Sequence, residues 1–299
     1  MMRNDVIKSV LVSGGTHGNE LSGVYAVEYW QQNSDELLAS SPSIHVDFTL
    51  VNEKAIKNRT RYVEEDLNRQ FSHVALNTNA NKRDKELNYE QQLAQSLNAR
   101  YGPKSNPQYD LVIDIHNTTS NMGPSVILLA LDEFHICLAR FIKNRMPEAV
   151  ILVEDQIPFE THPYFCTLGK KGLMLELGAQ AHSTLKASLF EQTKQLTHTI
   201  FAFIQSWNEQ SVAALPVVEA FKLIEEIKYP QNNGKKSAMI HPAIDGKDFL
   251  PLHKGDPCFL DFDGKTITWD EDTVYPHFIG EAAYHHLDIA FATASKITI

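Results

Sequence analysis

The chain has 299 residues, of which 43% are hydrophobic and 21% charged, so it can bury the core of one large domain or of a large and a small one. Its formal net charge of −10 argues against nucleic acid and anionic membrane surfaces as partners, because both are negatively charged. Three widely spaced cysteines, in no C-x-x-C pair, argue against a disulfide framework, and we expect a soluble cytoplasmic protein.

Strands and helices alternate through the first two thirds of the chain. We predict strands at residues 7–13, 44–51, 111–115, 125–131, 149–153 and 172–177, and helices at residues 21–31, 88–101, 133–145 and 185–207. Residues 52–70 are basic, rich in asparagine and without a clear period, and they are predicted as a loop. The alternation predicts an α/β fold with a mostly parallel or mixed sheet and helices on both faces. Sites in such folds lie past the carboxyl ends of strands.

The sequence pattern changes near residue 210. Short apolar segments then alternate with turn signals such as Asn233-Gly234 and Asp263-Gly264, which is typical of β-rich structure. We therefore predict a first domain at residues 1–210 and a smaller, β-rich C-terminal domain at residues 211–299.

Two candidate metal-binding segments follow predicted strands. His17 and Glu20 stand three residues apart between the first strand and the first helix, and His116 ends a later strand. A close pair of ligands with a distant third is a common arrangement in catalytic zinc sites, which keep one coordination position open. Asp114 or Asn117 could orient the imidazole of His116. Each segment alone also fits a simple turn or a strand-end histidine.

Two further features fit a hydrolytic site. Glu176 lies in an otherwise apolar strand, where an unpaired carboxylate is costly to bury, so it is either a general base near a metal or a residue on a solvent-exposed strand edge. Residues 57–69 hold a basic cluster that includes Arg61 and Arg69. Arginine binds carboxylates with two parallel hydrogen bonds, so this cluster could attract an anionic substrate; the alternative is a solvated basic loop.

Taken together, these motifs resemble the aspartoacylase family, a branch of the zinc carboxypeptidase-like hydrolases. The two longest matching segments are specific, and the shorter ones follow in order over essentially the whole chain. The matching segments are Gly-Gly-Thr-His-Gly-Asn-Glu-Leu-Ser-Gly (14–23), Thr-Arg-Tyr (60–62), Asp-Leu-Asn-Arg (66–69), Asp-Ile-His-Asn-Thr-Thr-Ser-Asn-Met-Gly (114–123), Glu-Leu-Gly (176–178), Leu-His-Lys-Gly-Asp-Pro (252–257), Asp-Gly-Lys-Thr-Ile (263–267) and Glu-Ala-Ala-Tyr (281–284).

The resemblance implies one zinc ion per subunit, held by His17, Glu20 and His116, with Glu176 as the general base. It also implies that Arg61 polarises the amide carbonyl and stabilises the oxyanion, a contribution often worth ~3 kcal/mol. Residues 1–210 would then be the catalytic domain, and residues 211–299 would cap the active site.

The resemblance further implies that Asn68 and Arg69 hold the α-carboxylate of a small anionic N-acyl amino acid and that Tyr284 closes the pocket. One position departs from the family. Animal aspartoacylases carry an arginine ten residues before the catalytic glutamate, where it grips the substrate side-chain carboxylate, and this chain has Cys166 there. Either Lys170 or Lys171 replaces that cation, or the preference for an aspartate side chain is weakened.

The main functional hypothesis is hydrolysis of N-acetyl-L-aspartate to acetate and L-aspartate. A close second is deacylation of N-acyl aromatic or other neutral amino acids, as in the related aminoacylases. Succinylglutamate desuccinylation, carboxypeptidase action and a non-catalytic binding protein on a zinc scaffold stay open as further alternatives. The family also suggests a possible homodimer.

Overall fold

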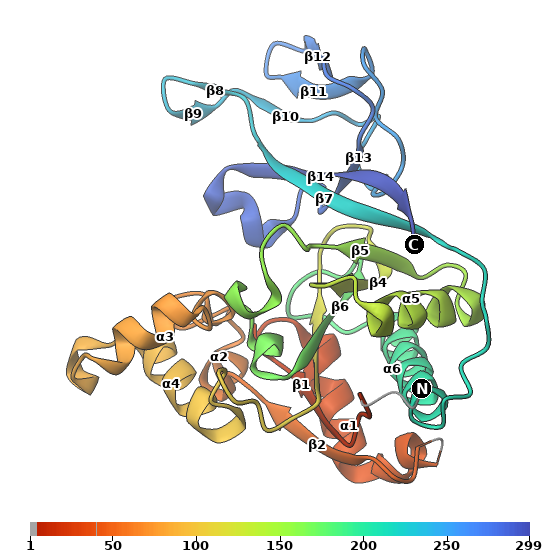
Figure 1. Ribbon diagram of the computed structural model, residues 1–299. Coiled ribbons are helices and arrows are strands. Elements are labelled where there is room, and N and C mark those ends of the chain that lie inside the picture. Colours follow the sequence, from red (N-terminus) through yellow and green to blue (C-terminus); the bar gives the residue numbers. More distant parts are fainter. Residues whose placement is uncertain (1–4, 40) are drawn as a thin grey trace.

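A mixed sheet forms the centre of the molecule. The computed structural model describes residues 5–39 and 41–299, and the strands of these residues form a nine-stranded sheet with the order β13-β14-β7-β5-β4-β6-β3-β1-β2 (Figure 1). Its strands are β1 (Ser9–Gly14), β2 (His45–Leu50), β3 (Leu111–Asn117), β4 (Gly123–Leu128), β5 (Val150–Val153), β6 (Lys171–Gly178), β7 (Glu219–Lys228), β13 (Tyr275–His277) and β14 (Ile289–Thr298). The α/β fold class predicted from the sequence is thus confirmed.

The helices are α1 (Leu21–Leu38), α2 (Glu53–Asn58), α3 (His73–Ala80), α4 (Tyr89–Tyr101), α5 (Glu133–Arg145) and α6 (Ala187–Asn208). Helices α4, α5 and α6 lie within a few residues of the predicted ranges, α1 is longer than predicted, and α2 and α3 were not predicted. Helix α1 runs past the predicted end at residue 31 and bends at Asn33, whose backbone is not helical.

The predicted loop at residues 52–70 contains helix α2 and the short 3-10 helix η1 (Leu67–Arg69), so that prediction was too simple. The side chain of Asn52 caps α2 by accepting a hydrogen bond from the Ala55 amide. Ala55 is the single buried residue of α2, so the segment has no apolar face from which a helical period could be recognised.

Strand β4 makes the sheet mixed. Strands β1, β2, β3 and β6 run parallel to one another, whereas β4 pairs antiparallel with β6. Only residues 118–122 separate β3 from β4, and a connection of this length cannot cross over to a parallel strand, which takes a dozen residues or more. The carboxyl ends of β1, β3 and β6 therefore meet at one edge of the sheet.

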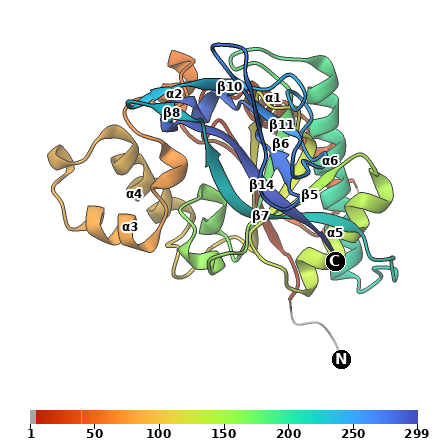
Figure 2. The ribbon, with the colours of Figure 1, turned by 90° about the horizontal axis from the view of Figure 1, so that it is seen from above.

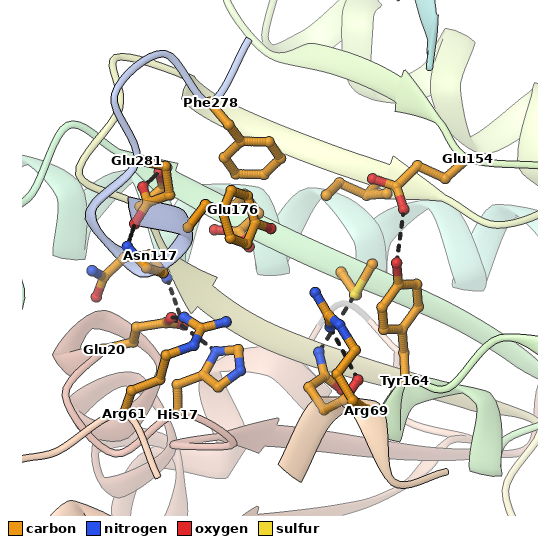
Figure 3. Close-up of a pocket in the computed structure, with 16 residues that line it drawn as sticks. His17, Glu20, Arg61, Arg69, Asn117, Glu154, Tyr164, Glu176, Phe278 and Glu281 are labelled. Atoms are coloured by element: carbon orange, nitrogen blue, oxygen red, sulfur yellow. Dashed lines mark hydrogen bonds and ion pairs between the residues drawn. The ribbon is translucent and has the colours of Figure 1, made fainter. Parts of the chain in front are cut away.

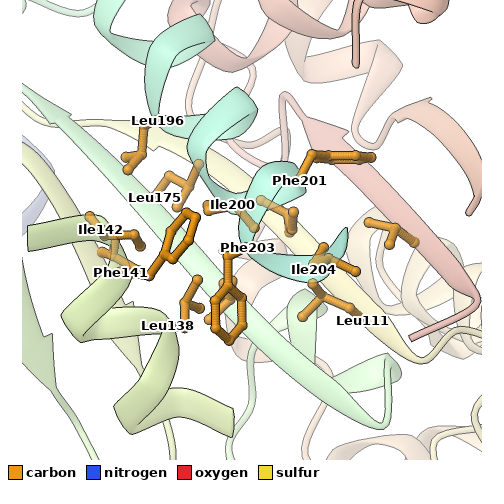
Figure 4. Packing of buried hydrophobic residues seen from close by; sticks show 14 of the residues in the cluster. Leu111, Leu138, Phe141, Ile142, Leu175, Leu196, Ile200, Phe201, Phe203 and Ile204 are labelled. Atoms are coloured by element: carbon orange, nitrogen blue, oxygen red, sulfur yellow. The ribbon is translucent and has the colours of Figure 1, made fainter. Parts of the chain in front are cut away.

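The two faces of the sheet carry different layers. Helices α5 and α6 lie on one side of the strands, and α3 and α4 lie on the other (Figure 2). On the first face, side chains of α5 and α6 such as Leu138, Ile200 and Phe203 pack with Leu175 of β6 in the larger hydrophobic core (Figure 4). A second core on the opposite face includes Met174, Phe165 and Phe278, and the pocket described below opens within this layer.

The C-terminal region extends the main sheet as well as adding structure of its own. Strand β7 pairs with β5 through two residue pairs, Leu152 with Phe221 and Val153 with Lys222, and β14 and β13 follow it. Beyond this edge lie a small sheet of β10 (Ala238–Ile240), β11 (Pro257–Asp261) and β12 (Thr266–Thr268) and a hairpin of β8 (Gln231–Asn232) and β9 (Lys235–Lys236). In the part of the chain that the structure describes, no helix is long and apolar enough to cross a membrane.

Candidate metal and substrate site

Glycines allow the turn after β1 to lie close against β3. A Cβ atom on Gly14 would stand 2.2 Å from the carbonyl oxygen of Gly23, and one on Gly23 would stand 2.2 Å from that of Ile115. Both positions therefore require glycine for helix α1 to pack directly on β1 and β3. The His17–Glu20 pair lies in the turn just before α1, rather than in its first helical turn, and this close packing brings it beside His116.

Three side chains, those of His17, Glu20 and His116, converge at this point and form the candidate metal-ligand group. The Nδ1 atom of His17 lies 2.8 Å from Oε1 of Glu20, and Nδ1 of His116 lies 2.8 Å from Oε2 of the same carboxylate. The two Nδ1 atoms are 3.2 Å apart. All three residues are buried, and one ligand atom from each lies within 4.8 Å of the others.

The outer contacts of both imidazoles indicate which nitrogen faces inward. Nε2 of His17 lies 3.0 Å from Oδ1 of Asp66, and Nε2 of His116 lies 2.8 Å from Oδ2 of Asp114. A carboxylate only accepts hydrogen bonds, so a neutral ring keeps its proton on Nε2 and turns the lone pair of Nδ1 toward Glu20. Two such lone pairs and a carboxylate at this spacing repel one another unless a cation lies between them. The donor set therefore fits a divalent metal ion.

Glu176 lies beside this group on the neighbouring strand. In the parallel pairing of β3 with β6, Glu176 is the partner of His116. Its Oε2 atom is buried and has no hydrogen-bond donor among the described residues. Burial raises the pKa of the Glu176 carboxyl well above its usual range. The strand is internal to the sheet, between β3 and β4, so the alternative of a solvent-exposed strand edge is excluded.

Arg61 connects the metal-ligand group with Asp66. Its Nη1 donates to Oε1 of Glu20 at 2.9 Å, while Nε and Nη2 donate to Oδ2 of Asp66 at 3.2 and 3.1 Å. Asp66 thus holds both Arg61 and His17. These contacts fix the guanidinium at the pocket wall next to the metal-ligand group.

Asn68 and Arg69 line the same pocket from helix η1. The Oδ1 atom of Asn68 accepts a hydrogen bond of 2.8 Å from the Phe165 amide, and Nη1 of Arg69 donates to the Asn68 carbonyl at 3.1 Å. The Arg69 guanidinium lies over the ring of Tyr164, 5.3 Å from its centroid. The structure therefore brings together all the site residues that the sequence predicted.

The pocket extends away from the metal-ligand group over one face of the sheet. Figure 3 shows His17, Glu20 and Arg61 at one end, and Arg69, Tyr164 and Glu154 at the other. The pocket is lined by His17, Glu20, Arg61, Asn68, Arg69, Asn117, Thr118, Ile127, Glu154, Tyr164, Met174, Glu176, Phe278, Glu281, Ala283 and Tyr284. Sequence reasoning missed Glu154, Tyr164 and Phe278. A carboxylate directly after an apolar strand was the one available signal, and it pointed to Glu154.

The two lysines that the sequence offered as substitutes for a side-chain arginine lie elsewhere. Lys170 pairs with Asp110, and Lys171 pairs with Asp132 at the amino end of β6, whereas Glu176 lies near its carboxyl end. Neither lysine lines the pocket. That hypothesis was wrong because the strand continues for five residues after Lys171 before it reaches the site. Cys166 is buried and does not line the pocket, and burial raises the pKa of its thiol well above the usual range.

Glu281 holds the C-terminal region against the loop that follows β3. Its Oε2 accepts hydrogen bonds from the Thr119 amide at 2.8 Å and from the Thr118 hydroxyl, and its Oε1 accepts from the Ala283 amide at 2.9 Å. The last contact caps the 3-10 helix η5 (Ala282–Leu287), which carries Tyr284. Burial opposes ionisation, but His182, whose Nε2 lies 3.5 Å from Oε1, and the hydrogen bonds from Thr118 and Ala283 bring the pKa of Glu281 down to about 2.

Replacing Glu281 should loosen this closure. We expect Glu281→Ala to lower the free energy of unfolding by about 2–4 kcal/mol, because the partly buried Thr119 amide and the buried Thr118 hydroxyl lose their acceptor and η5 loses its cap. Since the folded pKa lies below the usual value, the stabilisation by Glu281 is complete above pH ~4.5 and is lost as the pH falls toward 2. Urea denaturation at pH 7 measures the loss, with the exposed Glu271→Ala as the matched control. Equal stability of both variants would contradict the role given to Glu281.

The fold and the metal-ligand group fit a class of α/β enzymes whose candidate metal site lies past the carboxyl ends of parallel strands. Comparison with known proteins names the family. A model of the succinylglutamate desuccinylase/aspartoacylase catalytic domain matches residues 6–204, and one of the AstE/AspA barrel-sandwich hybrid domain matches residues 216–296. The chain belongs to the succinylglutamate desuccinylase/aspartoacylase family and is a hydrolase.

Individual relatives match over nearly their whole length. Aspartoacylase of Mus musculus is 38% identical, over 98% of this chain and 94% of its own. An N-acyl-aromatic-L-amino acid amidohydrolase (carboxylate-forming) of Xenopus laevis is 34% identical, over 97% of this chain and 95% of its own. Among solved structures, murine aminoacylase 3 has a TM-score of 0.89 at 32% identity and covers 100% of this chain and 98% of its own.

Proposed function

We propose that this protein is a zinc-dependent amidohydrolase that removes the acyl group from N-acyl-L-amino acids. The convergence of His17, Glu20 and His116, with both outer imidazole nitrogens held by carboxylates, is the observation that supports it most. Imidazole and carboxylate ligands of this kind suit zinc. Relatives named for aspartate and for aromatic substrates share the cleavage of an N-acyl bond. They therefore support deacylation of an amino acid more strongly than they support one particular substrate side chain.

Each polar side chain of the pocket has a place in this reaction. Zinc in such a site supplies Lewis acidity and an acidified water. Glu176 is placed to take the proton from the attacking water at its unpaired Oε2 and to pass it to the leaving amine nitrogen. Arg61, held by Asp66, donates to the oxygen on which charge develops, a contribution often worth ~3 kcal/mol.

The remaining contacts bind and enclose the amino acid. Asn68 and Arg69 are placed to hold the α-carboxylate, because Arg69 is the second cation among the pocket-lining residues and Arg61 already serves the metal end. Phe278 and Tyr284 line the pocket from the C-terminal region, and we therefore propose that residues 211–299 cap a catalytic domain at residues 1–210. Specificity for N-acetyl-L-aspartate stays a prediction, with less support because Lys170 and Lys171 do not line the pocket.

Metal analysis combined with a substrate panel tests the proposal. The purified protein should bind about one zinc ion per chain and hydrolyse some of a set of N-acetyl-L-amino acids that spans acidic, polar, aliphatic and aromatic side chains. Treatment with a chelator should abolish turnover, and added zinc should restore it. A zinc-loaded protein that is inactive on the whole panel would instead support a non-catalytic binding protein.

A further inference from the structure

The far end of the pocket holds a carboxyl that the proposed hydrolysis does not use. Glu154 directly follows β5, is 8% exposed, and lines the same pocket as the metal-ligand group (Figure 3). The carboxylates of Glu20 and Glu176 serve the metal end, and that of Glu281 holds the loop after β3. Burial of a carboxyl costs free energy, so a buried carboxyl that faces a binding pocket is expected to have a function there.

The contacts of Glu154 fix it toward the pocket. The hydroxyl of Tyr164 donates to Oε2 of Glu154 at 3.3 Å. The Tyr164 ring contacts the Arg69 guanidinium, 5.3 Å from its centroid, and stacks with the ring of His162, with the two ring centroids 5.4 Å apart. The negative charge of Glu154 raises the pKa of the Tyr164 phenol well above its usual range, so the phenol stays a donor. Glu154 therefore presents an acceptor group to the end of the pocket.

The apolar wall leads a substrate side chain toward this acceptor. Met174 precedes Glu176 by two residues on the same face of β6, and Ile127 lies beside it on the adjacent strand β4. In the proposed function the acyl group lies at the metal-ligand group and the α-carboxylate on Arg69, and this placement would direct the amino acid side chain past Met174 and Ile127 to Glu154.

We propose that Glu154 is a specificity-determining residue that excludes anionic side chains and favours uncharged side chains, above all those with an N–H or O–H group at the tip. This inference rests on the proposed function, because that function places the acyl group at the metal end. Arg61 is paired with Glu20 and Asp66, and the proposed function assigns Arg69 to the substrate α-carboxylate, so the described pocket offers no further arginine or lysine to a side-chain carboxylate. In a partly desolvated pocket such a charge is repelled.

The ionisation of Glu154 makes this exclusion depend on pH. Burial raises its pKa to about 7, with the charge of Glu226 acting in the same direction and Arg69 and the Tyr164 hydroxyl acting against it. Tyr284 and Cys166 also interact with the charge of Glu154, and burial raises the pKa of both groups, so neither ionises as the pH rises from 6 to 8. Since a carboxyl is neutral below its pKa, repulsion of an anionic side chain should weaken as the pH falls through about 7.

A pair of nearly isosteric substrates isolates this charge effect. N-acetyl-L-asparagine and N-acetyl-L-aspartate differ at the side-chain tip, so the ratio of their kcat/KM values cancels effects at the metal end. In the wild type we expect the asparagine substrate to be preferred by ~10- to 100-fold, and in Glu154→Gln we expect that preference to fall at least ~10-fold. Glu160→Gln removes the same charge from an exposed position nearby and should leave the ratio unchanged.

The outcomes separate the specificity role from other roles. A Glu154→Gln variant that lowers kcat/KM equally for both substrates would show that Glu154 acts through Arg69, and the proposal would be overturned. A wild-type preference for the aspartate substrate would also overturn it. If Glu154→Gln does not fold, the wild-type protein decides the question. Its preference for the asparagine substrate should decrease as the pH is lowered from 8 to 6, and a constant ratio contradicts the proposal.

Ligand binding provides a readout that needs no turnover. In the Glu176→Gln background, thermal shifts with the two substrates should show the same preference for N-acetyl-L-asparagine, and adding Glu154→Gln should reduce it. If the zinc-loaded wild type hydrolyses neither substrate nor any other panel member, the proposed function fails, while the thermal shifts still test Glu154. Equal shifts for the two compounds would overturn the inference about Glu154 alone.

Discussion

The Glu176→Gln variant should retain its zinc and lose most of its turnover. Glutamine keeps the size of the side chain but cannot take a proton from water at neutral pH, and a positioned general base typically contributes ~10²- to 10⁴-fold to the rate. We therefore expect kcat to fall in that range. The three side chains of the metal-ligand group do not include Glu176, so the zinc content should stay at the wild-type level.

The measured pattern distinguishes a base from a structural residue. Steady-state kinetics on the best panel substrate should show a fall in kcat with little change in KM, because the α-carboxylate contacts proposed for Asn68 and Arg69 are untouched. Unfolding in urea should show no loss of stability, since burial raises the pKa of Glu176 and a neutral amide suits the same surroundings. A variant that keeps its kcat would remove Glu176 from the mechanism.

Much of the fold and of the metal-ligand group could be predicted from the sequence because both depend on local signals. The strand that ends at Gly14 and the buried strand β3 are apolar and β-branched, and a histidine follows or ends each of them. Parallel strands place such ends at one edge, which is how His17 and His116 could be expected to meet across 99 residues of chain. The family motifs then covered nearly the whole chain, and the match to the family confirms that resemblance.

The rest of the site depends on long-range packing that local patterns do not contain. Glu154 follows a strand of only four residues, and its position in the pocket depends on the antiparallel placement of β4 beside β6. The positions of Lys170 and Lys171 follow from the exact start of β6, a boundary that sequence patterns define to within a few residues at best. The addition of β7, β14 and β13 to the main sheet likewise depends on the pairing of Leu152 with Phe221.

The His116→Ala variant should lose both tightly bound zinc and activity. His116 supplies one of the three candidate ligand atoms, and its removal also leaves the buried Asp114 carboxylate without an imidazole partner and Glu20 with that of His17 alone. Because a zinc ion contributes several kcal/mol of transition-state stabilisation, we expect kcat/KM to fall by at least ~10³-fold. Zinc content after dialysis and kinetics on the best panel substrate measure the two effects, with the exposed His45→Ala as control.

The Asp114→Asn variant should have an intermediate zinc affinity, which a purely structural role of His116 would not explain. Asparagine has nearly the same shape and can still accept a hydrogen bond from Nε2, but it removes the charge that orients and polarises the imidazole. Removal of such an outer partner typically weakens metal binding by ~10- to 100-fold, so zinc affinity should rank wild type above Asp114→Asn and Asp114→Asn above His116→Ala. If His116→Ala keeps wild-type zinc affinity, the three side chains do not form the metal site, and the proposed mechanism loses its basis.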